Sequence, residues 1–313
     1  MAKWTTSDIP PQRGRSAVIT GTGGLGYETA LALARAGADV IIAGRDPAKG
    51  QAAVSHIRDA VPVATVGFEL VDLANLESVA MFGTRLREKR RSLDLLINNA
   101  AVMTPPKRME TSDGFELQFG TNYLGHFALT AQLLPLLTHG SNPRVVSVSS
   151  VAARSGAIDF TDLQAMRAYK PMAVYARSKL ANLMFAFELQ RRSDAAGWGL
   201  SSIAAHPGIS RTDLIHNGMG RLSAAGFART FMWFLFQPAP QGALPTLFAA
   251  TSSTARAGSY YGPDKLSEIR GYPAAAKPPQ QALDVEVAAR LWDVSEQLIG
   301  APLQREAIRA AGS

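Results

Sequence analysis

The chain of 313 residues contains no cysteine. This absence excludes disulfide bonds, thiolate metal sites and a cysteine nucleophile. Histidine is also scarce, because the five histidines are scattered and none has the paired spacing of metal ligands. We therefore expect no metal site and no thiol chemistry.

Long hydrophobic runs are absent too. The N-terminal sequence MAKWTTSDIPPQRGR has no apolar region like that of a signal peptide, and the most apolar later stretch, Phe231 to Phe236, is far too short to span a bilayer. We therefore expect a soluble, cytoplasmic protein without stable membrane insertion.

Basic residues exceed acidic residues, 32 to 25, which gives a formal charge of +7 and a pI near 9.8. The densest basic cluster lies between residues 85 and 91 and contains Arg85, Arg87, Lys89, Arg90 and Arg91. It ends an expected helix, where cations complement the helix dipole, and it lacks interleaved aromatic side chains that could stack on bases. We interpret the cluster as a solvated surface and expect no nucleic-acid partner.

The length and the hydrophobic content of 47 % suit one substantial core. Proline- and glycine-rich stretches occur only near the ends and around 262–280, and we find no repeat and no linker. The sequence therefore predicts a single domain over residues 1–313. Its parts are a core at about 15–262, a substrate-lining segment at 213–245, and a C-terminal extension at 263–313 with a terminal helix.

Short apolar strands alternate with helices along the chain. Strands are expected at 17–20, 39–43, 66–71, 93–97, 144–149, 200–205 and 259–261. Helices are expected from Tyr27 to a C-terminal cap at Gly37 and at 47–60, 75–90, 115–137, 240–251 and 284–298, with another that carries Tyr175. Such alternation predicts an α/β fold of the Rossmann type, a doubly wound parallel sheet flanked by helices. These sheets bind ligands at the carboxyl ends of their strands.

A glycine-rich turn follows the first strand. Gly21, Gly23 and Gly26 fit the pattern G-x-G-x-x-G, and Thr22, Gly24 and Leu25 complete the loop. Glycines at this place let the backbone approach a pyrophosphate, and the amides of the next helix face its negative charge. The turn therefore predicts a dinucleotide site, although a tight turn without a ligand is the alternative.

The residue after the second strand indicates which dinucleotide is bound. A carboxylate there would bind a ribose 2'-hydroxyl and repel a 2'-phosphate, whereas this chain has Arg45. An arginine can pair with the phosphate, so NADP(H) is favoured. Asp46 next to it keeps NAD(H) possible, and a solvated Arg-Asp turn is the structural alternative.

Tyr175 and Lys179 stand four residues apart at the start of an apolar, helical run. Positions i and i+4 share one helix face, where an ammonium near a phenol favours its deprotonated form. Tyr261 and Lys265 have the same spacing, but Gly262 and Pro263 between them are incompatible with a helix. The first pair is therefore the candidate for proton exchange.

Taken together and in order, these motifs resemble the short-chain dehydrogenase/reductase family from about Arg15 to Gly262. The long interval between Ser150 and Tyr175 and the ending YYGPDKLSEIRGYP resemble its retinol dehydrogenase-like and protochlorophyllide reductase-like branch. The remaining matches are Asp72-Leu73, Asn98-Asn99-Ala100-Ala101, Asn122, Ser150, and His206-Pro207-Gly208 through Thr212.

The resemblance implies roles for individual residues. Ser150 would orient the substrate oxygen, with Ser149 as the alternative if the strand ends one residue earlier. Tyr175 would exchange a proton, Lys179 would hold the nicotinamide ribose and lower the tyrosine pKa, and Asn122 would anchor a relay water. The cofactor-binding residues would be Gly21, Thr22, Gly23, Gly24, Leu25, Gly26, Arg45, Asp72, Leu73, Asn98, Ala100, Tyr175, Lys179, Pro207, Gly208, Ile209 and Thr212.

Two departures from the family pattern concern the cofactor site. The glycine turn is one residue shorter than T-G-x-x-x-G-x-G, because only Thr22 and Gly23 separate Gly21 from Gly24. Ala101 also replaces the glycine of Asn-Asn-Ala-Gly, which narrows the space beside the cofactor.

Substrate choice is expected between Ile215 and Pro245, where an aromatic cluster could line an apolar pocket. Its members are Phe227, Phe231, Met232, Trp233, Phe234 and Phe236. Core packing, a contact in a homo-oligomer and membrane docking are the alternatives.

The resemblance implies a bulky lipophilic ketone or alcohol as the substrate. A carbonyl reductase or alcohol dehydrogenase that uses NADP(H) is the leading hypothesis. A carbon-carbon double-bond reductase on the same scaffold and a non-catalytic NADP(H) sensor are the alternatives, and the complete Ser150, Tyr175 and Lys179 set disfavours the sensor.

Overall fold

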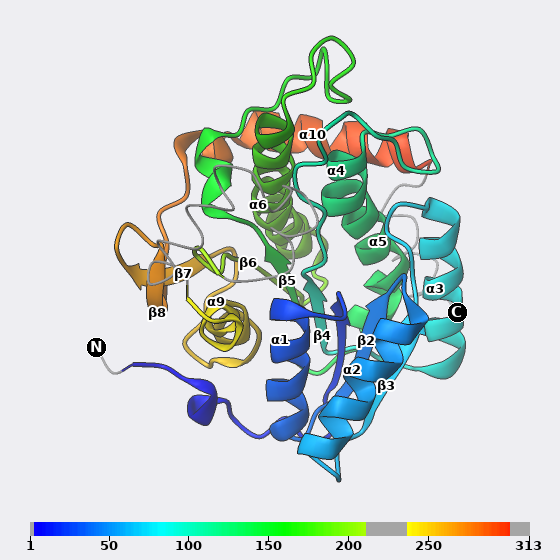
Figure 1. The fold of residues 1–313 in the computed structure, drawn as a ribbon, viewed down its shortest axis with the longest axis vertical. Helices are drawn as coiled ribbons and strands as arrows, with labels where there is room; N and C mark the ends of the chain where they lie inside the picture. The colour runs from blue at the N-terminus through cyan, green and yellow to red at the C-terminus, as the bar shows by residue number, and fades with distance from the viewer. Residues whose placement is uncertain (1–2, 211–236, 301–313) are drawn as a thin grey trace.

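The computed structural model describes residues 3–210 and 237–300 and contains one eight-stranded sheet (Figure 1). The strand order is β3-β2-β1-β4-β5-β6-β7-β8, with parallel pairing from β3 to β7 and an antiparallel β8 at the edge. The strands are β1 (Ser16–Thr20), β2 (Asp39–Gly44), β3 (Val66–Leu70), β4 (Leu95–Asn98), β5 (Arg144–Val148), β6 (Ser201–Ala205), β7 (Tyr260–Lys265) and β8 (Arg270–Ala275).

Helices cover both faces of the sheet. One face packs against α1 (Gly24–Arg35), α2 (Pro47–Ala60) and α9 (Ala239–Thr251). The other packs against α3 (Leu76–Lys89), α5 (Gly125–Leu137), α6 (Pro171–Ala196) and α10 (Val285–Ile299). Short elements complete the fold: η1 (Thr6–Asp8), α4 (Leu117–Phe119), the π-helical turn η2 (Gly120–Leu124), η3 (Val151–Ser155) and η5 (Gln280–Leu283).

The predicted α/β class and the doubly wound sheet are confirmed. Each predicted strand and helix is present within a few residues, because strong local patterns specify them: apolar strands end in turn residues, and helices begin at caps such as Asp46, Asn75 and Asp284. The strand order reverses beside β1, where β4 pairs on its other edge. The carboxyl ends of β1 and β4 therefore form the expected ligand-binding crevice.

The sequence missed β8 and the composite nature of the helix expected at 115–137. The expected core ended near residue 262, whereas β7 continues to Lys265 and pairs with β8 up to Ala275. The long helix is divided into α4, η2 and α5, and its middle turn is π-helical. Antiparallel edge pairing and a π turn depend on distant contacts, which local periodicity does not report.

The basic cluster at 85–91 is partly paired with acidic side chains. Lys89 Nζ lies 2.6 Å from Glu69 Oε1, and Arg90 forms an ion pair with Asp39. Arg87 Nη1 donates to the Gln132 carbonyl oxygen at 2.6 Å. These contacts support a structural surface around the end of α3.

Within residues 3–210 and 237–300, no helix is long and apolar enough to cross a membrane. Most of the expected substrate-lining segment, including its aromatic cluster, lies outside the described residues. Thr212 lies outside them as well.

Candidate active site

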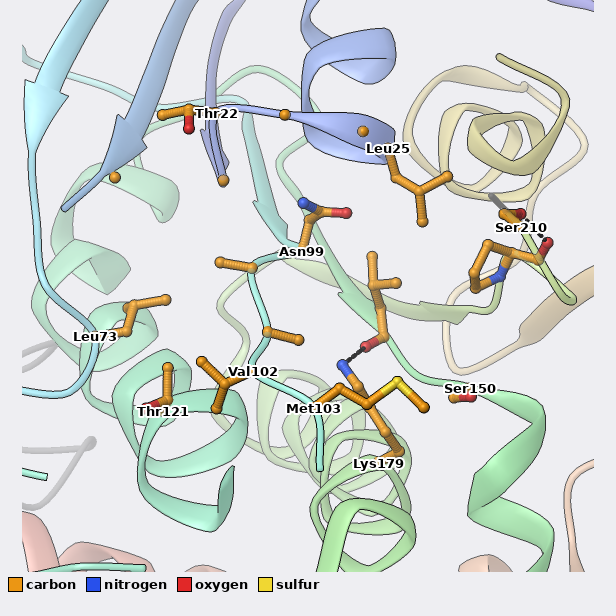
Figure 2. Close-up of a pocket in the computed structure, with 18 of the residues that line it drawn as sticks. Thr22, Leu25, Leu73, Asn99, Val102, Met103, Thr121, Ser150, Lys179 and Ser210 are labelled. Carbon is orange, nitrogen blue, oxygen red and sulfur yellow. Dashed lines mark hydrogen bonds between the residues drawn. The ribbon is translucent and has the colours of Figure 1, made fainter. Parts of the chain in front are cut away.

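A cleft with a volume of about 590 Å³ lies at the carboxyl ends of the strands, as expected for this sheet. Figure 2 shows side chains from β1–α1, β4 and α6 converging on it, with Thr22 and Leu25 at one wall and Ser150 and Lys179 at another. The predicted residues that line it are Gly21, Thr22, Gly23, Gly24, Leu25, Arg45, Asp72, Leu73, Ala100, Ser150, Tyr175, Lys179, Pro207, Gly208 and Ile209.

Three predicted residues do not line the cleft. Gly26 lies behind the turn, where an added Cβ would come within 2.5 Å of the Gly21 carbonyl oxygen. Asn98 is buried and donates to Thr130 Oγ1 at 3.1 Å, whereas its neighbour Asn99 lines the cleft. Asn122 is the third predicted residue that does not line the cleft. Successive side chains at the end of a strand point to opposite faces of the sheet. An error of one residue in the predicted strand end therefore assigns a core residue to the cleft.

The glycine turn has the properties of an anion site. Gly21 (φ 101°) and Gly24 (φ 52°) adopt backbone conformations that favour glycine, and a Cβ on Gly21 would lie 2.9 Å from Asn99 Nδ2. Gly23 precedes α1 but has no side chain to cap the first amides of the helix. Uncapped amides at a helix N-terminus are suited to a phosphate group, so the shortened turn still fits a dinucleotide pyrophosphate.

The far end of the cleft, after β2, carries two cations. Arg45 and Lys49 both line it and are exposed. The Asp46 carboxylate accepts the Lys49 amide at 3.1 Å as the cap of α2, and Lys49 Nζ lies 3.8 Å from it. Asp46 is thus engaged by the helix, which leaves the Arg45 guanidinium without an ion pair among the described side chains. Lys49 was missed by sequence reasoning, because its place one turn into α2 is set only by the fold.

Tyr175 and Ser150 meet at the opposite end of the cleft. Tyr175 is 6 % exposed, and the Ser150 hydroxyl lies near enough to its phenol to lower the pKa of that group. The Ser150 hydroxyl also accepts the Ala152 amide at 3.2 Å as the cap of η3. Ser149 instead donates to the Lys179 carbonyl oxygen at 2.7 Å. Ser150 is therefore the serine that faces the tyrosine.

The electrostatic expectation for this tyrosine was wrong. Burial raises the pKa of Tyr175 to about 12, and the hydrogen bond from Ser150 is the effect that opposes the rise. Lys179 lies 5.9 Å from the centre of the phenol ring and points its ammonium at the Val148 carbonyl oxygen, 3.1 Å away. The shared helix face brings the two side chains near each other, but the ammonium is directed at the strand and not at the phenol oxygen.

Lys179 is itself almost completely buried at 2 % exposure. Burial lowers the pKa of its ammonium from 10.5 to about 8, so the side chain remains protonated at neutral pH. A protonated lysine at the cleft wall can donate to the hydroxyls of a bound ribose.

Asn122 holds two parts of the site together. Its Oδ1 accepts the Val102 amide at 2.7 Å, and its Nδ2 donates to the Val102 carbonyl oxygen at 2.9 Å and to Ser178 Oγ at 3.0 Å. Asn122 lies on the π turn of η2 and does not itself line the cleft. The structure thus gives Asn122 a positioning contact to Val102, and the water relay remains a prediction.

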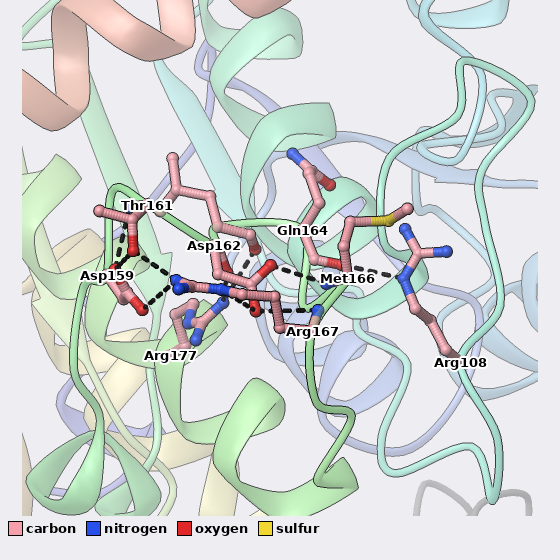
Figure 3. Close-up of polar contacts among 9 residues, drawn as sticks. Arg108, Asp159, Thr161, Asp162, Gln164, Met166, Arg167 and Arg177 are labelled. Carbon is pink, nitrogen blue, oxygen red and sulfur yellow. Dashed lines mark hydrogen bonds and ion pairs between the residues drawn. The ribbon is translucent and has the colours of Figure 1, made fainter.

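The long interval between Ser150 and Tyr175 forms a loop that is held by polar contacts (Figure 3). Arg177 Nη1 donates to the carbonyl oxygens of Asp162 and Leu163 at 2.6 and 3.0 Å. Arg108 Nε donates to the Gln164 carbonyl oxygen at 2.9 Å. The loop is therefore fixed against α6 and against the segment that follows β4.

Side chains missed by the sequence complete the wall between these ends. They are apolar or weakly polar: Val102, Met103, Thr121, Val151 and Met172. Thr121 lines the cleft, and its hydroxyl is buried without a hydrogen-bond partner in the described structure. Asn99 and Ala101, which also line the cleft, did have a sequence signal, because they belong to the Asn-Asn-Ala-Ala motif.

Comparison with known proteins identifies relatives along most of the chain. Residues 15–219 match the family model described as short chain dehydrogenase. Retinol dehydrogenase 13 of Mus musculus is 40% identical over 293 residues, which cover 92% of this chain and 84% of the relative. Polyprenol dehydrogenase of the same organism is 40% identical over 299 residues, which cover 94% and 86%.

Solved structures share the fold. A crystal structure of an uncharacterized protein from Mycobacterium paratuberculosis is 40% identical, covers 96% of this chain and 99% of that one, and superposes with a TM-score of 0.80. A short chain dehydrogenase from Shigella flexneri, solved with NADP, is 21% identical, covers 81% and 98%, and has a TM-score of 0.63. At that identity the second likeness shows the fold alone.

Proposed function

Since this chain belongs to the short-chain dehydrogenase/reductase family, we propose that it is an NADP(H)-dependent oxidoreductase that interconverts the alcohol and carbonyl forms of a bulky lipophilic substrate. The observation that carries this proposal is the placement of Ser150, Tyr175 and Lys179 together at one wall of the cleft. It presents two hydroxyl groups to the same point, where a substrate oxygen can accept from both.

The cofactor fits the cleft from end to end. The phosphates fit the uncapped amides at the start of α1, and a 2'-phosphate fits Arg45 with Lys49. The nicotinamide must lie near Tyr175, because hydride and proton reach neighbouring atoms of the substrate. A bound nicotinamide would therefore lie between Lys179 and the strand-end segment Pro207–Ser210, which lines the same cleft.

The bound cofactor would supply or accept the hydride at the substrate carbon. For reduction, the Tyr175 phenol donates its proton to the substrate oxygen while Ser150 donates a second hydrogen bond to it. Both bonds strengthen as negative charge develops on that oxygen, which favours the transition state over the ground state. A tyrosine with a pKa of about 12 is protonated at neutral pH and is therefore ready to donate.

The lipophilic substrate is supported by the cleft lining and by the relatives. Val102, Met103, Val151 and Met172 provide apolar contacts next to the serine and the tyrosine. Met172 is 47 % exposed, so the apolar wall continues to the surface. The similar proteins named for retinol and polyprenol act, by those names, on lipophilic alcohols.

The first test is turnover of NADPH and NADH with bulky aldehydes and ketones, together with NADP⁺ and long lipophilic alcohols, and identification of each product. We expect alcohol–carbonyl interconversion and no saturation of activated alkenes. Tyr175→Phe should lower kcat by about 10²- to 10⁴-fold, the typical contribution of a general acid, and leave the Kd for NADP⁺ within about threefold.

Tyr169→Phe is a suitable control, because that tyrosine lies on the loop between Ser150 and Tyr175 and accepts a hydrogen bond from Gln118 of α4, but it does not line the cleft. It should keep most of the activity. Equal turnover by wild type and Tyr175→Phe, or products reduced only at a carbon-carbon double bond, would refute the proposed reaction.

A further inference from the structure

The turn between β7 and β8 has an unusual backbone. Leu266, Ser267 and Glu268 all have positive φ, at 50°, 53° and 68°. Three consecutive non-glycine residues in this region are uncommon, because each side chain crowds its own backbone. Such a conformation persists where surrounding contacts determine it, and it often marks a functional position.

Glu268 is the best-connected residue of this turn, because its carboxylate joins three separate segments. One oxygen accepts from Arg154 Nη2 at 2.7 Å and from His206 Nε2 at 3.0 Å. The other accepts the Lys277 amide at 2.9 Å. Arg154 lies on η3, directly after Ser150, and His206 precedes the strand-end segment Pro207–Ser210 of the cleft.

The hydrogen bonds of His206 define its tautomer. Its Nδ1 accepts the Gly208 amide at 3.2 Å, so the proton of the neutral ring lies on Nε2 and is donated to Glu268. The ring is completely buried, and an added Cβ on Gly262 would lie 1.9 Å from Nε2. The imidazole is thus enclosed between the hairpin and the cleft segment, with both nitrogens engaged.

The same turn contacts the cleft segment directly. The Ile209 amide donates to the Ile269 carbonyl oxygen at 2.9 Å, next in sequence to Glu268. Gly208 has a φ of 66°, and a Cβ there would lie 2.2 Å from that carbonyl oxygen. The backbone of Pro207–Ser210 is therefore hydrogen-bonded to the hairpin and packs so closely on it that position 208 has no room for a side chain.

We propose that Glu268 is a positioning residue that fixes the Pro207–Ser210 wall for the nicotinamide half of the cofactor. It acts through His206 on Gly208 and through Arg154 on the segment that begins at Ser150. The proposal rests on the proposed function, because it assumes a nicotinamide beside this wall. It gives a role to the motif YYGPDKLSEIRGYP, whose residues build the hairpin.

Two substitutions test whether Glu268 positions the cleft wall or only stabilises the fold. Glu268→Ala leaves the buried His206 Nε2–H without an acceptor, so the ring and the Gly208 amide lose their fixed orientation. Glu268→Gln retains an oxygen for His206 and loses the charge. We expect the alanine variant to be impaired and the glutamine variant to recover most of the loss.

The readout compares two ligands, NADP⁺ and 2'-phospho-ADP-ribose, which lacks the nicotinamide. For Glu268→Ala we expect the Kd of NADP⁺ to rise about tenfold, which corresponds to the loss of one hydrogen bond to a charged group. The Kd of 2'-phospho-ADP-ribose should change less than about twofold. Glu268→Gln should bind NADP⁺ within about threefold of wild type. Equal losses for both ligands would show a general structural effect and overturn the proposal.

Asp264→Ala is the matched control. Asp264 lies on the same hairpin and accepts the Tyr272 amide at 2.8 Å, but it does not contact the cleft segment. Hydrogen exchange of the peptide over residues 207–210 supplies a test that needs no ligand. It should accelerate in Glu268→Ala and stay at the wild-type rate in Asp264→Ala. Unchanged exchange in Glu268→Ala would overturn the positioning role, whereas failure of the wild type to bind either ligand would refute the proposed function.

Discussion

Burial of the charged Lys179 ammonium lowers the stability of the folded protein. Its pKa falls from 10.5 to about 8 because burial disfavours the ammonium, and among the described residues its hydrogen-bond partner is the Val148 carbonyl oxygen. A lowered lysine pKa destabilises the fold below pH 8, where the ammonium is charged in both the folded and the unfolded chain. The penalty disappears as the pH rises from about 8 to 10.5.

Lys179→Met should therefore stabilise the cofactor-free protein. We expect a gain of up to roughly 3 kcal/mol at pH 7 and little gain at pH 10.5, together with loss of turnover. Urea unfolding of the variant and the wild type at both pH values measures this. A variant that is less stable than wild type at pH 7 would contradict the assignment of a buried, costly charge.

Other single residues show which contacts local sequence patterns can predict and which they cannot. The spacing of Tyr175 and Lys179 correctly indicated a shared helix face, since α6 is continuous over both. It could not indicate that Ser150 and not Lys179 lowers the pKa of the phenol, because that depends on which group the ammonium faces. Asn98 and Asn99 differ for a similar reason, since one residue of register decides which of them lines the cleft.

At the scale of elements, α6 is supported along its length by α10. Trp292 of α10 stacks on Phe185 of α6, with ring centres 5.7 Å apart, and meets Phe127 of α5 edge to face at 4.9 Å. The Arg192 guanidinium lies 4.5 Å from the tryptophan ring on the outer side. The helix that carries Tyr175 and Lys179 is thus anchored at its far end by the C-terminal helix.

Trp292→Ala should lower the free energy of unfolding by about 3–5 kcal/mol, because the ring is 1 % exposed and its removal leaves a cavity between three helices. Activity per folded molecule should change little at a temperature well below the midpoint. Val285→Ala on the same helix is the control, since Val285 is 53 % exposed and should cost less than about 0.5 kcal/mol. Chemical denaturation measures both, and a Trp292→Ala variant as stable as this control would refute the anchoring role.

At the scale of the whole molecule, both ends of the cleft are built on the carboxyl ends of strands in one sheet. Arg45 follows β2 near one edge, whereas Ser150 follows β5, with β1 and β4 between them. A dinucleotide that reaches from Arg45 to Tyr175 would therefore contact the ends of several strands at once. Such a ligand binds only the folded chain and stabilises it by mass action.

We expect NADP⁺ at about 100 times its Kd to add roughly 2.7 kcal/mol to the free energy of unfolding and to raise Tm by a few degrees. Arg45→Ala should reduce the shift given by the same concentration of NADP⁺ and leave the shift given by NAD⁺ unchanged, since only NADP⁺ carries the 2'-phosphate. Arg91→Ala is the control, because Arg91 is exposed before β4, at the amino ends of the strands. Equal shifts for NADP⁺ and NAD⁺ in wild type would argue against a 2'-phosphate site.

Local sequence patterns were enough to predict the class of fold and the order of its elements, because apolar periodicity, glycine turns and helix caps act over a few neighbouring residues. They also placed Tyr175, Ser150 and the glycine turn at the same edge of the sheet, since parallel strands carry their carboxyl ends to one side. Only the tertiary structure decided the electrostatics of that edge. The burial of Lys179, the second cation at Lys49 and the contacts of Glu268 with His206 and Arg154 join residues far apart in the chain. No local pattern encodes those distances, because they are set by how helices and strands pack.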